Sequence, residues 1–413
     1  MVFSSTVFLF LFLPVVIAVY YNPFVKKRGF RNIVLLLASL FFYGWGEPVF
    51  VFLMILSIIV NWAFGLMVDG MAKKGNKLGM KLGMILSVVY NLGLMFVFKY
   101  LTFVTKNISY LLHNDSIVVN IALPIGISFF TFQLMSYVFD VYYGTAKVQK
   151  NLLYVGLYVS MFPQLIAGPI VRYETVADEI VNRVENRKDF AEGFGRFVVG
   201  LGKKILISNY VGKIADIAFA TEGGMSVAMA WLGAIAYTLQ IYFDFSGYSD
   251  MAIGLGRMFG FHFLENFNFP YVSKSITEFW RRWHITLSTW FRDYVYIPLG
   301  GNRVSKGRHI WNIFVVWFLT GVWHGANWTF ICWGLLYFVL LMFEKLTGFH
   351  KKNGWYMHIY TMFFVILGWV LFRADSITAA GQYIGNMFGA GATGFIDATF
   401  IDCVKNSAVI FAA

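Results

Sequence analysis

The chain has 413 residues, of which 59% are apolar and only 13% are charged, and its mean hydropathy is +0.66. Soluble globular domains carry about a quarter charged residues, so this composition excludes a soluble enzyme, a disordered chain and a coiled coil. The formal charge of +12 is divided among short basic clusters between apolar runs, which argues against a nucleic-acid-binding face and favours contact with membrane lipid.

The apolar runs predict an all-α, polytopic membrane protein with about ten to twelve membrane helices, because one crossing takes roughly 20 residues. We expect residues 1–413 to form a single membrane domain. The first run, residues 2–21, precedes a basic cluster from Lys26 to Arg31. Because basic loops remain in the cytoplasm, the N-terminus is expected outside it.

The remaining segments follow in chain order. A Gly-Glu-Pro sequence at 46–48 separates the second segment from the third, and the polar stretch 173–196 predicts a cytoplasmic amphipathic excursion. The last apolar stretch begins near Ala408 and stops at Ala413, too soon for a crossing, so we expect a final span to be missing. The other predicted segments are 31–46, 48–67, 79–103, 117–143, 151–167, 205–220, 226–245, 249–264, 310–345 and 356–372.

The segment 310–345 is too long for one crossing. Residues 310–343 contain no Asp, Glu, Lys or Arg, and a continuous helix of this length reaches about 50 Å, well beyond the ~30 Å hydrocarbon core. Basic residues flank the run on both sides, so the positive-inside rule places both ends in the cytoplasm. The sequence therefore predicts a helical hairpin whose tip, Trp323 to Gly325, lies inside the bilayer.

His324 stands at this tip. Histidine exchanges a proton near neutral pH, and an ionisable group inside a membrane is a candidate functional residue. A histidine that packs between helices and bonds a backbone carbonyl is an equally good interpretation of the position.

Residues 277–294 carry five charged side chains and predict a helix that lies in the membrane interface or lines a wet cavity. An ordinary surface helix with tryptophan anchors is the alternative. At 3.6 residues per turn, one face of the 277–294 helix carries Thr277, Arg281, His284, Ser288 and Arg292.

A further polar patch lies where the apolar run 226–245 ends and the run 249–264 begins. Within it, Asp250 either caps the following helix or contributes to a site.

Five motifs occur in an order typical of a known family. They are PIGISFFTFQ at 124–133, QLIAGPIVRY at 164–173, DFSGYSDMAIG at 244–254, RRWHITLSTWFRDYVYIPLGGNR at 281–303 and GVWHGANWTFICWG at 321–334. With them, nearly the whole chain resembles the membrane-bound O-acyltransferase family, in particular its bacterial branch of polysaccharide O-acetylation proteins such as those that modify alginate. The resemblance implies a multi-span helical fold around a central tunnel in the bacterial inner membrane.

By this resemblance, acetyl-CoA or another acyl-CoA on the cytoplasmic side is the donor, and a hydroxyl group of an exported polysaccharide is the acceptor. No permanently bound cofactor is expected, and Cys332 and Cys403 stand in no metal-ligand spacing. His324 matches the family's principal histidine and is interpreted as the general base. His284 matches the second histidine of this branch, and it orients the thioester or stabilises the developing oxyanion. An extracytoplasmic acetyltransferase of the Ser-Asp-His type is the implied partner.

Two further sets of side chains are assigned as hypotheses. The set that meets the anionic acyl-CoA consists of Arg281, Arg282 and Arg292. The set that lines the substrate path consists of Asn327, Ser288 and Asp250.

Two alternative functions remain open. Proteins that transfer D-alanine to teichoic acids share the Arg-Trp-His and Trp-His-Gly elements, so D-alanyl transfer is the alternative within the enzymes. A transporter or channel that uses His324, His284 and Asp250 as a proton or solute path is the alternative outside them.

Overall fold

The computed structural model describes residues 1–24, 27–166, 168–221 and 224–412, and the secondary structure within these ranges is helical, which confirms the predicted fold class. Lys26 and Ala413, which the sequence interpretation used, lie outside the described residues. The chain divides into two compact units. Unit 1 comprises residues 1–199 and 248–265, and unit 2 comprises residues 200–247 and 266–413. The single membrane domain over the whole chain stays a prediction.

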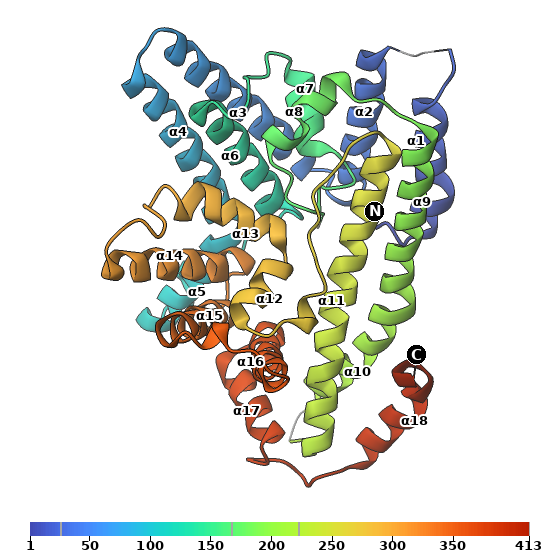
Figure 1. The fold of residues 1–413 in the computed structure, drawn as a ribbon, viewed down its shortest axis with the longest axis vertical. Helices are drawn as coiled ribbons and strands as arrows, with labels where there is room; N and C mark the ends of the chain where they lie inside the picture. The colour runs from blue at the N-terminus through green and yellow to red at the C-terminus, as the bar shows by residue number, and fades with distance from the viewer. Residues whose placement is uncertain (25–26, 167, 222–223, 413) are drawn as a thin grey trace. The chain divides into compact units, whose positions relative to one another are not determined.

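Unit 1 contains the helices of the N-terminal half. The turn predicted at 46–48 is confirmed, because α2 ends at Gly46 and α3 begins at Phe50. Figure 1 shows α3, α4 and α6 packed side by side. The helices are η1 (Phe8–Phe12), α1 (Leu13–Tyr20), α2 (Arg28–Gly46), α3 (Phe50–Lys73), α4 (Lys77–Met95), η2 (Phe96–Tyr100), α5 (Leu101–Leu112), η3 (Asp115–Ile117), α6 (Ile127–Tyr143), α7 (Leu152–Ser160), α8 (Tyr173–Asn182) and the larger part of α9 (Arg187–Gly202).

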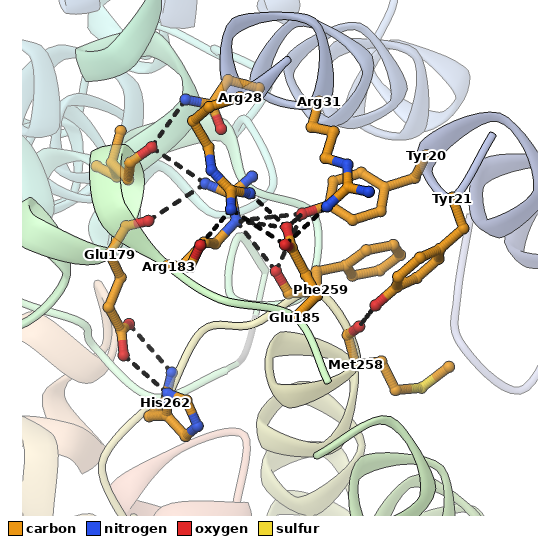
Figure 2. Close-up of polar contacts among 12 residues, drawn as sticks. Tyr20, Tyr21, Arg28, Arg31, Glu179, Arg183, Glu185, Met258, Phe259 and His262 are labelled. Carbon is orange, nitrogen blue, oxygen red and sulfur yellow. Dashed lines mark hydrogen bonds and ion pairs between the residues drawn. The ribbon is translucent and has the colours of Figure 1, made fainter. Parts of the chain in front are cut away.

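A polar cluster joins several of these helices, as Figure 2 shows. Glu185, in the turn between α8 and α9, accepts hydrogen bonds from Tyr20 at the end of α1 and from Arg28 and Arg31 in the first turn of α2. The Nη1 atom of Arg31 lies 2.7 Å from Oε2 of Glu185. Arg183 donates from Nε to the hydroxyl of Tyr20 at 3.2 Å. We call these five residues the Glu185 cluster.

Glu185 stays ionised in this setting. Its side chain is only 6% exposed, and such burial opposes ionisation. Hydrogen bonds from Arg28 and Tyr20 outweigh the burial and lower the pKa of the Glu185 carboxyl to about 2. The Glu185 carboxylate therefore links α1 and α2 to the α8–α9 turn through hydrogen bonds and ion pairs at neutral pH.

Unit 2 contains the C-terminal helices. Its core is aromatic, with Trp280, Trp333, Tyr337 and Trp369 packed together. The helices are η4 (Lys203–Ser208), α10 (Asn209–Ala220), the first part of α11 (Val227–Met258), η5 (Pro270–Val272), α12 (Ile276–Arg282), α13 (Ile285–Phe291), η6 (Arg292–Tyr296), α14 (Lys306–His324), α15 (Trp328–Thr347), η7 (Phe349–Lys351), α16 (Tyr356–Arg373), α17 (Ile377–Met387) and α18 (Ala398–Ala412).

The predicted hairpin over 310–345 is confirmed. Helix α14 ends at His324 and α15 begins at Trp328, so the turn falls at the predicted tip. The two arms approach closely at Gly321 and Gly334, where a Cβ on Gly321 would stand 2.5 Å from the backbone oxygen of Phe330. Small residues permit such close packing of membrane helices.

Within the described ranges, five helical segments are long and apolar enough to cross a membrane. Together with the many exposed Val, Leu, Ile and Phe side chains, they make this a multi-pass membrane protein. The total of ten to twelve membrane helices stays a prediction. The five segments are Arg28–Gly46, Phe50–Lys73, Lys77–Leu112, Trp328–Thr347 and Tyr356–Arg373.

Three boundaries predicted from apolar runs are wrong. The predicted break between the runs 226–245 and 249–264 does not exist, because one continuous helix, α11, passes through it and ends at Met258. Asp250 therefore caps no helix, and its Oδ1 accepts from Arg196 at 2.8 Å. The predicted segments 117–143 and 151–167 include non-helical chain, since α6 begins only at Ile127 and α7 ends at Ser160.

Candidate active site

The helix predicted over residues 277–294 is wrong, because the chain breaks at His284. Helix α12 ends at Arg282, and Trp283 is extended. His284 adopts the left-handed conformation with φ 44° before α13 begins at Ile285. The face on which the sequence placed Thr277, Arg281, His284, Ser288 and Arg292 therefore does not exist as one surface.

Asn266 supplies the partner groups that make this break possible. Its backbone oxygen accepts from the backbone N–H of Ile285 at 2.9 Å, and its Oδ1 accepts from the backbone N–H of Thr286 at 3.3 Å. The first N–H groups of a helix lack partners within the helix, so Asn266 caps α13 from a segment 18 residues earlier. Left-handed backbone at a non-glycine residue costs about 1–3 kcal/mol and persists where its surroundings enforce it.

The imidazole of His284 is enclosed. The residue is 2% exposed, its Nδ1 lies 3.0 Å from Oδ1 of Asn266, and its ring meets Phe245 edge to face at 4.7 Å. Burial lowers the pKa of His284 to about 3, because an apolar surrounding disfavours the charged form. The ring is therefore neutral at physiological pH. We call His284, Asn266, Thr286 and Phe245 the His284 cluster.

A carboxylate holds the other end of α12. Both oxygens of Glu344, on α15, face the start of α12: Oε1 accepts from the backbone N–H of Ile276 at 2.6 Å, and Oε2 accepts from the backbone N–H and hydroxyl of Thr277 at 2.9 and 2.7 Å. An anion at a helix N-terminus is favourable. Glu344 thus links the helix that leads into His284 to the hairpin that carries His324.

His324 is the last residue of α14 and lies among aromatic rings. Its imidazole is partly buried and packs against Trp333 at 4.9 Å, Trp323 at 5.0 Å and Phe372 at 5.1 Å between ring centroids. Trp323 also contacts His284, with 6.0 Å between the centroids. The two predicted histidines therefore pack against the same side chain, Trp323, although 40 positions separate them in the sequence.

A cavity of about 570 Å³ opens beside this region, a volume in the range of small-molecule sites. Helix α12 contributes Arg281, and the end of α15 contributes Lys345. Apolar side chains line the rest of the wall, among them Val316 and Trp317 of α14. The polar lining residues are Thr277, Arg281, Tyr296, Lys345, His350 and Lys351.

The other predicted site residues lie apart from this cavity lining. Arg282 pairs with Glu278 at 2.9 Å, and Arg292 pairs with Asp293 at 2.7 Å. Ser288 is exposed on α13. Asn327 caps α15 through its Oδ1, which accepts from the N–H of Thr329, and donates from Nδ2 to the Asp375 carbonyl. Their assigned contacts with donor or substrate stay predictions, as does that of Asp250 in unit 1.

Sequence reasoning missed Asn266 and Glu344. Glu344 is the first charged residue after a long uncharged run, which was a usable signal because intramembrane carboxylates are rare. Asn266 gave no such signal, since an asparagine in a loop is common and its partner lies 18 residues away. Lys345 and Lys351 belong to a basic cluster that the sequence predicts to be cytoplasmic and able to meet lipid headgroups or cofactor phosphates, but sequence alone does not place them in a cavity with Arg281.

These features define a class: a multi-pass helical membrane protein with one buried and one partly buried histidine, and with a cationic cavity lined by the helices that lead to them. The family profile of the membrane-bound O-acyltransferases matches residues 149–381, a range that includes both histidines. The chain belongs to this family, and it is an O-acyltransferase-type enzyme. Family membership disfavours the transporter or channel alternative.

Named relatives agree with this assignment. The "probable alginate O-acetylase AlgI" of Pseudomonas syringae pv. tomato is 44% identical over 95% of this chain and 76% of its own length. The peptidoglycan O-acetyltransferase of Helicobacter pylori is 35% identical over 94% of this chain and 80% of its own length. The teichoic acid D-alanyltransferase of Bacillus subtilis is 31% identical over 56% of this chain and 61% of its own length.

Proposed function

We propose that this protein transfers an acetyl group from acetyl-CoA to a hydroxyl group of an exported polysaccharide, in the inner membrane of a bacterium. The observation that carries the proposal is the cationic cavity lined by α12, which leads into His284, and by α14, which ends at His324. Coenzyme A carries several phosphate groups, and Arg281, Lys345 and Lys351 supply charges to match them. The apolar wall of the cavity suits the uncharged arm that ends in the thioester.

His324 is the proposed general base. A hydroxyl group is a poor nucleophile until its proton is removed as the new bond forms. In the transfer, the acceptor oxygen bonds to the acetyl carbon, the carbon–sulfur bond breaks, and the hydroxyl proton passes through His324 to the leaving thiolate. Three aromatic rings pack against His324 and reduce the access of water to it, which favours transfer over hydrolysis.

Purified protein in lipid nanodiscs tests this function directly. With labelled acetyl-CoA and an oligosaccharide acceptor, we expect label in the sugar and one free thiol for each acetyl group lost from the donor. A wild-type preparation that binds acetyl-CoA without releasing thiol in the presence of acceptor would contradict acetyl transfer from this donor.

The acceptor and partner are proposed from relatives. The names of the AlgI and peptidoglycan relatives point to cell-envelope glycans, so mass spectrometry of surface polysaccharide with and without the gene tests the acceptor. An extracytoplasmic Ser-Asp-His acetyltransferase is proposed to complete delivery, and it is expected to co-purify with this chain. Unchanged glycan acetylation after deletion of that partner's gene would exclude delivery of the acetyl group through the partner.

D-alanyl transfer to teichoic acid is the second candidate, favoured by the similarity to the Bacillus subtilis enzyme. Its donor is a thioester on a carrier protein. The cavity has three strongly basic side chains. Coenzyme A, with several phosphate groups, fits this cavity better than the carrier-protein donor, whose arm has a single phosphodiester. Discharge of a D-alanyl carrier but not of acetyl-CoA would favour this second candidate.

A further inference from the structure

We propose that Asn266 is a positioning residue that fixes the tautomer of His284, so that Nε2 of His284 accepts a hydrogen bond from an N–H or O–H group of the substrate. The catalytic part of this inference rests on the proposed function. The tautomer itself rests only on the geometry of the His284 cluster.

The orientation of the Asn266 amide follows from its neighbours. The backbone N–H of Thr286 points to the same side-chain atom that faces His284. A backbone N–H is only a donor, so the atom it meets must be the amide oxygen and not the nitrogen. The hydroxyl of Thr286 also lies 2.9 Å from this oxygen and donates to it.

The tautomer of His284 follows from that orientation. Because Oδ1 of Asn266 only accepts, the Nδ1 atom of His284 must carry the proton that it shares with this oxygen at 3.0 Å. In a neutral imidazole, the other nitrogen then has a lone pair and no proton. Nε2 of His284 is therefore an acceptor, and burial keeps the ring neutral.

This arrangement changes the role expected for His284. A neutral ring protonated at Nδ1 cannot donate from Nε2, so His284 does not stabilise an oxyanion through that atom. Among the described residues, Nε2 of His284 has no hydrogen-bond partner, although it is buried. A buried polar atom without a partner costs about 1–3 kcal/mol, and a substrate N–H or O–H would remove that cost.

Two substrate groups have the required chemistry. The arm of coenzyme A carries amide N–H groups, and the acceptor sugar carries hydroxyl groups. His284 lies on Trp323, which also contacts His324, so either group is near the proposed base when it reaches His284. Both sources share one requirement, a donor hydrogen directed at Nε2.

Nitrogen NMR of protein labelled with ¹⁵N-histidine tests the tautomer. The chain has seven histidines, and the His284 signals are those lost in His284→Gln. We expect a protonated-type shift at Nδ1 and an unprotonated, pyridine-type shift at Nε2, unchanged between pH 5 and 8. The reverse pattern, or titration near pH 6.5, would overturn the inference whether or not the protein transfers acetyl groups.

Variants test the positioning role. Asn266→Ala removes the oxygen, and we expect a mixture of tautomers and a kcat lower by roughly 10- to 100-fold. Asn266→Asp keeps an acceptor oxygen and adds a negative charge, so it should retain the Nδ1–H tautomer and raise the pKa seen in the rate profile. The matched control is Asn268→Ala, an exposed neighbour in the same loop, which should resemble the wild type in both respects.

The assay has two arms that separate the substrate sources. If the coenzyme A arm donates to His284, Asn266→Ala slows both hydrolysis of acetyl-CoA in water and transfer to sugar. If the sugar donates, only transfer slows. Wild-type kcat in Asn266→Ala together with an altered tautomer would show that the tautomer has no catalytic role. If Asn266→Ala does not fold, the wild-type spectrum and Asn266→Asp still decide the inference.

Discussion

The Glu185 cluster in unit 1 and the His284 cluster in unit 2 differ in how completely the central side chain, Glu185 or His284, is hydrogen-bonded. Both oxygens of Glu185 accept hydrogen bonds from charged or hydroxyl donors. Within the described chain, Nε2 of His284 and Nδ2 of Asn266 have no such partner. Nε of Arg31 and Nη2 of Arg183 in the Glu185 cluster also lack partners among the residues that the structure describes, so the contrast concerns the central acceptors: both Glu185 oxygens are paired, and Nε2 of His284 is not. A paired buried acceptor stabilises a fold, whereas an unpaired one lowers stability and is retained where a ligand completes it. The contrast separates a structural cluster from a candidate reactive one.

The largest expected effect in unit 2 is the loss of His324, which packs against the same tryptophan as His284. We expect His324→Ala to reduce acetyl transfer by about 10²- to 10⁴-fold, the usual contribution of a general base, with the melting temperature nearly unchanged. Thiol release from acetyl-CoA measures the rate. His113→Asn, at the left-handed residue that ends α5, is the control and should keep full activity. Normal transfer by His324→Ala would remove the base assignment.

The opposite pattern is expected for Glu185. Glu185→Gln leaves Arg28 and Arg31 without a carboxylate, and breaking a buried ion pair costs about 3–5 kcal/mol. Thermal unfolding of the purified protein should show a large fall in melting temperature. Asp178→Asn, an exposed position on α8, should change stability by less than about 0.5 kcal/mol. Equal melting temperatures for Glu185→Gln and the wild type would break the comparison.

The pH dependence follows from the lowered pKa of Glu185. A carboxyl whose pKa is lower in the folded protein contributes its stability above its unfolded pKa and loses it as the pH falls through the folded value. With a shift from 4.5 to about 2, the contribution of Glu185 is complete above about pH 5 and declines between there and pH 2. The melting temperatures of the wild type and Glu185→Gln should therefore differ most at pH 7 and converge as the pH approaches 2.

Packing at the hairpin gives a smaller effect. A Cβ at Gly321 would meet the backbone oxygen of Phe330 at 2.5 Å, so Gly321→Ala should lower stability by about 1–3 kcal/mol and displace His324. Gly307→Ala lies in the same helix with open space around it and should be neutral or stabilising. Chemical unfolding of the two variants gives the comparison, and a Gly321→Ala protein as stable as Gly307→Ala would contradict close packing of the arms.

The smallest expected effect is in donor binding. Arg281 lines the cavity, whereas Arg282 pairs with Glu278. Arg281 is exposed, and Arg281→Gln should raise the KM for acetyl-CoA by at most about tenfold, which corresponds to about 1.4 kcal/mol. The effect should weaken in high salt, because ions screen exposed charges. Arg282→Gln is the matched control, and an equal rise in both variants would remove the cavity from the proposed donor site.

The features that sequence predicted well depend on length and composition alone. The hairpin over 310–345 was predictable because an uncharged run of that length exceeds the bilayer, and both flanks are basic. The turn at 46–48 was predictable because Gly-Glu-Pro ends helices locally. In each case the deciding residues are neighbours in the chain.

The features that sequence missed depend on distant partners. The break at His284 requires Asn266, and continuous α11 requires Arg196 to pair with Asp250. A periodicity argument uses only the residues of the helix itself. It therefore predicted an unbroken helical face at His284 and a helix cap at Asp250. The aromatic contacts of His324 come from α14, α15 and α16, and no spacing rule brings those three together.

The sequence separation within the Glu185 cluster has a consequence for biosynthesis. Arg28 precedes Glu185 by 157 positions, so at about 5–20 residues per second a ribosome needs roughly 8 to 30 s to deliver the carboxylate after the arginine. During that interval the first helices of the nascent chain carry uncompensated guanidinium groups. A nascent chain that has not reached the α8–α9 turn therefore lacks the carboxylate that links α1 and α2 to that turn.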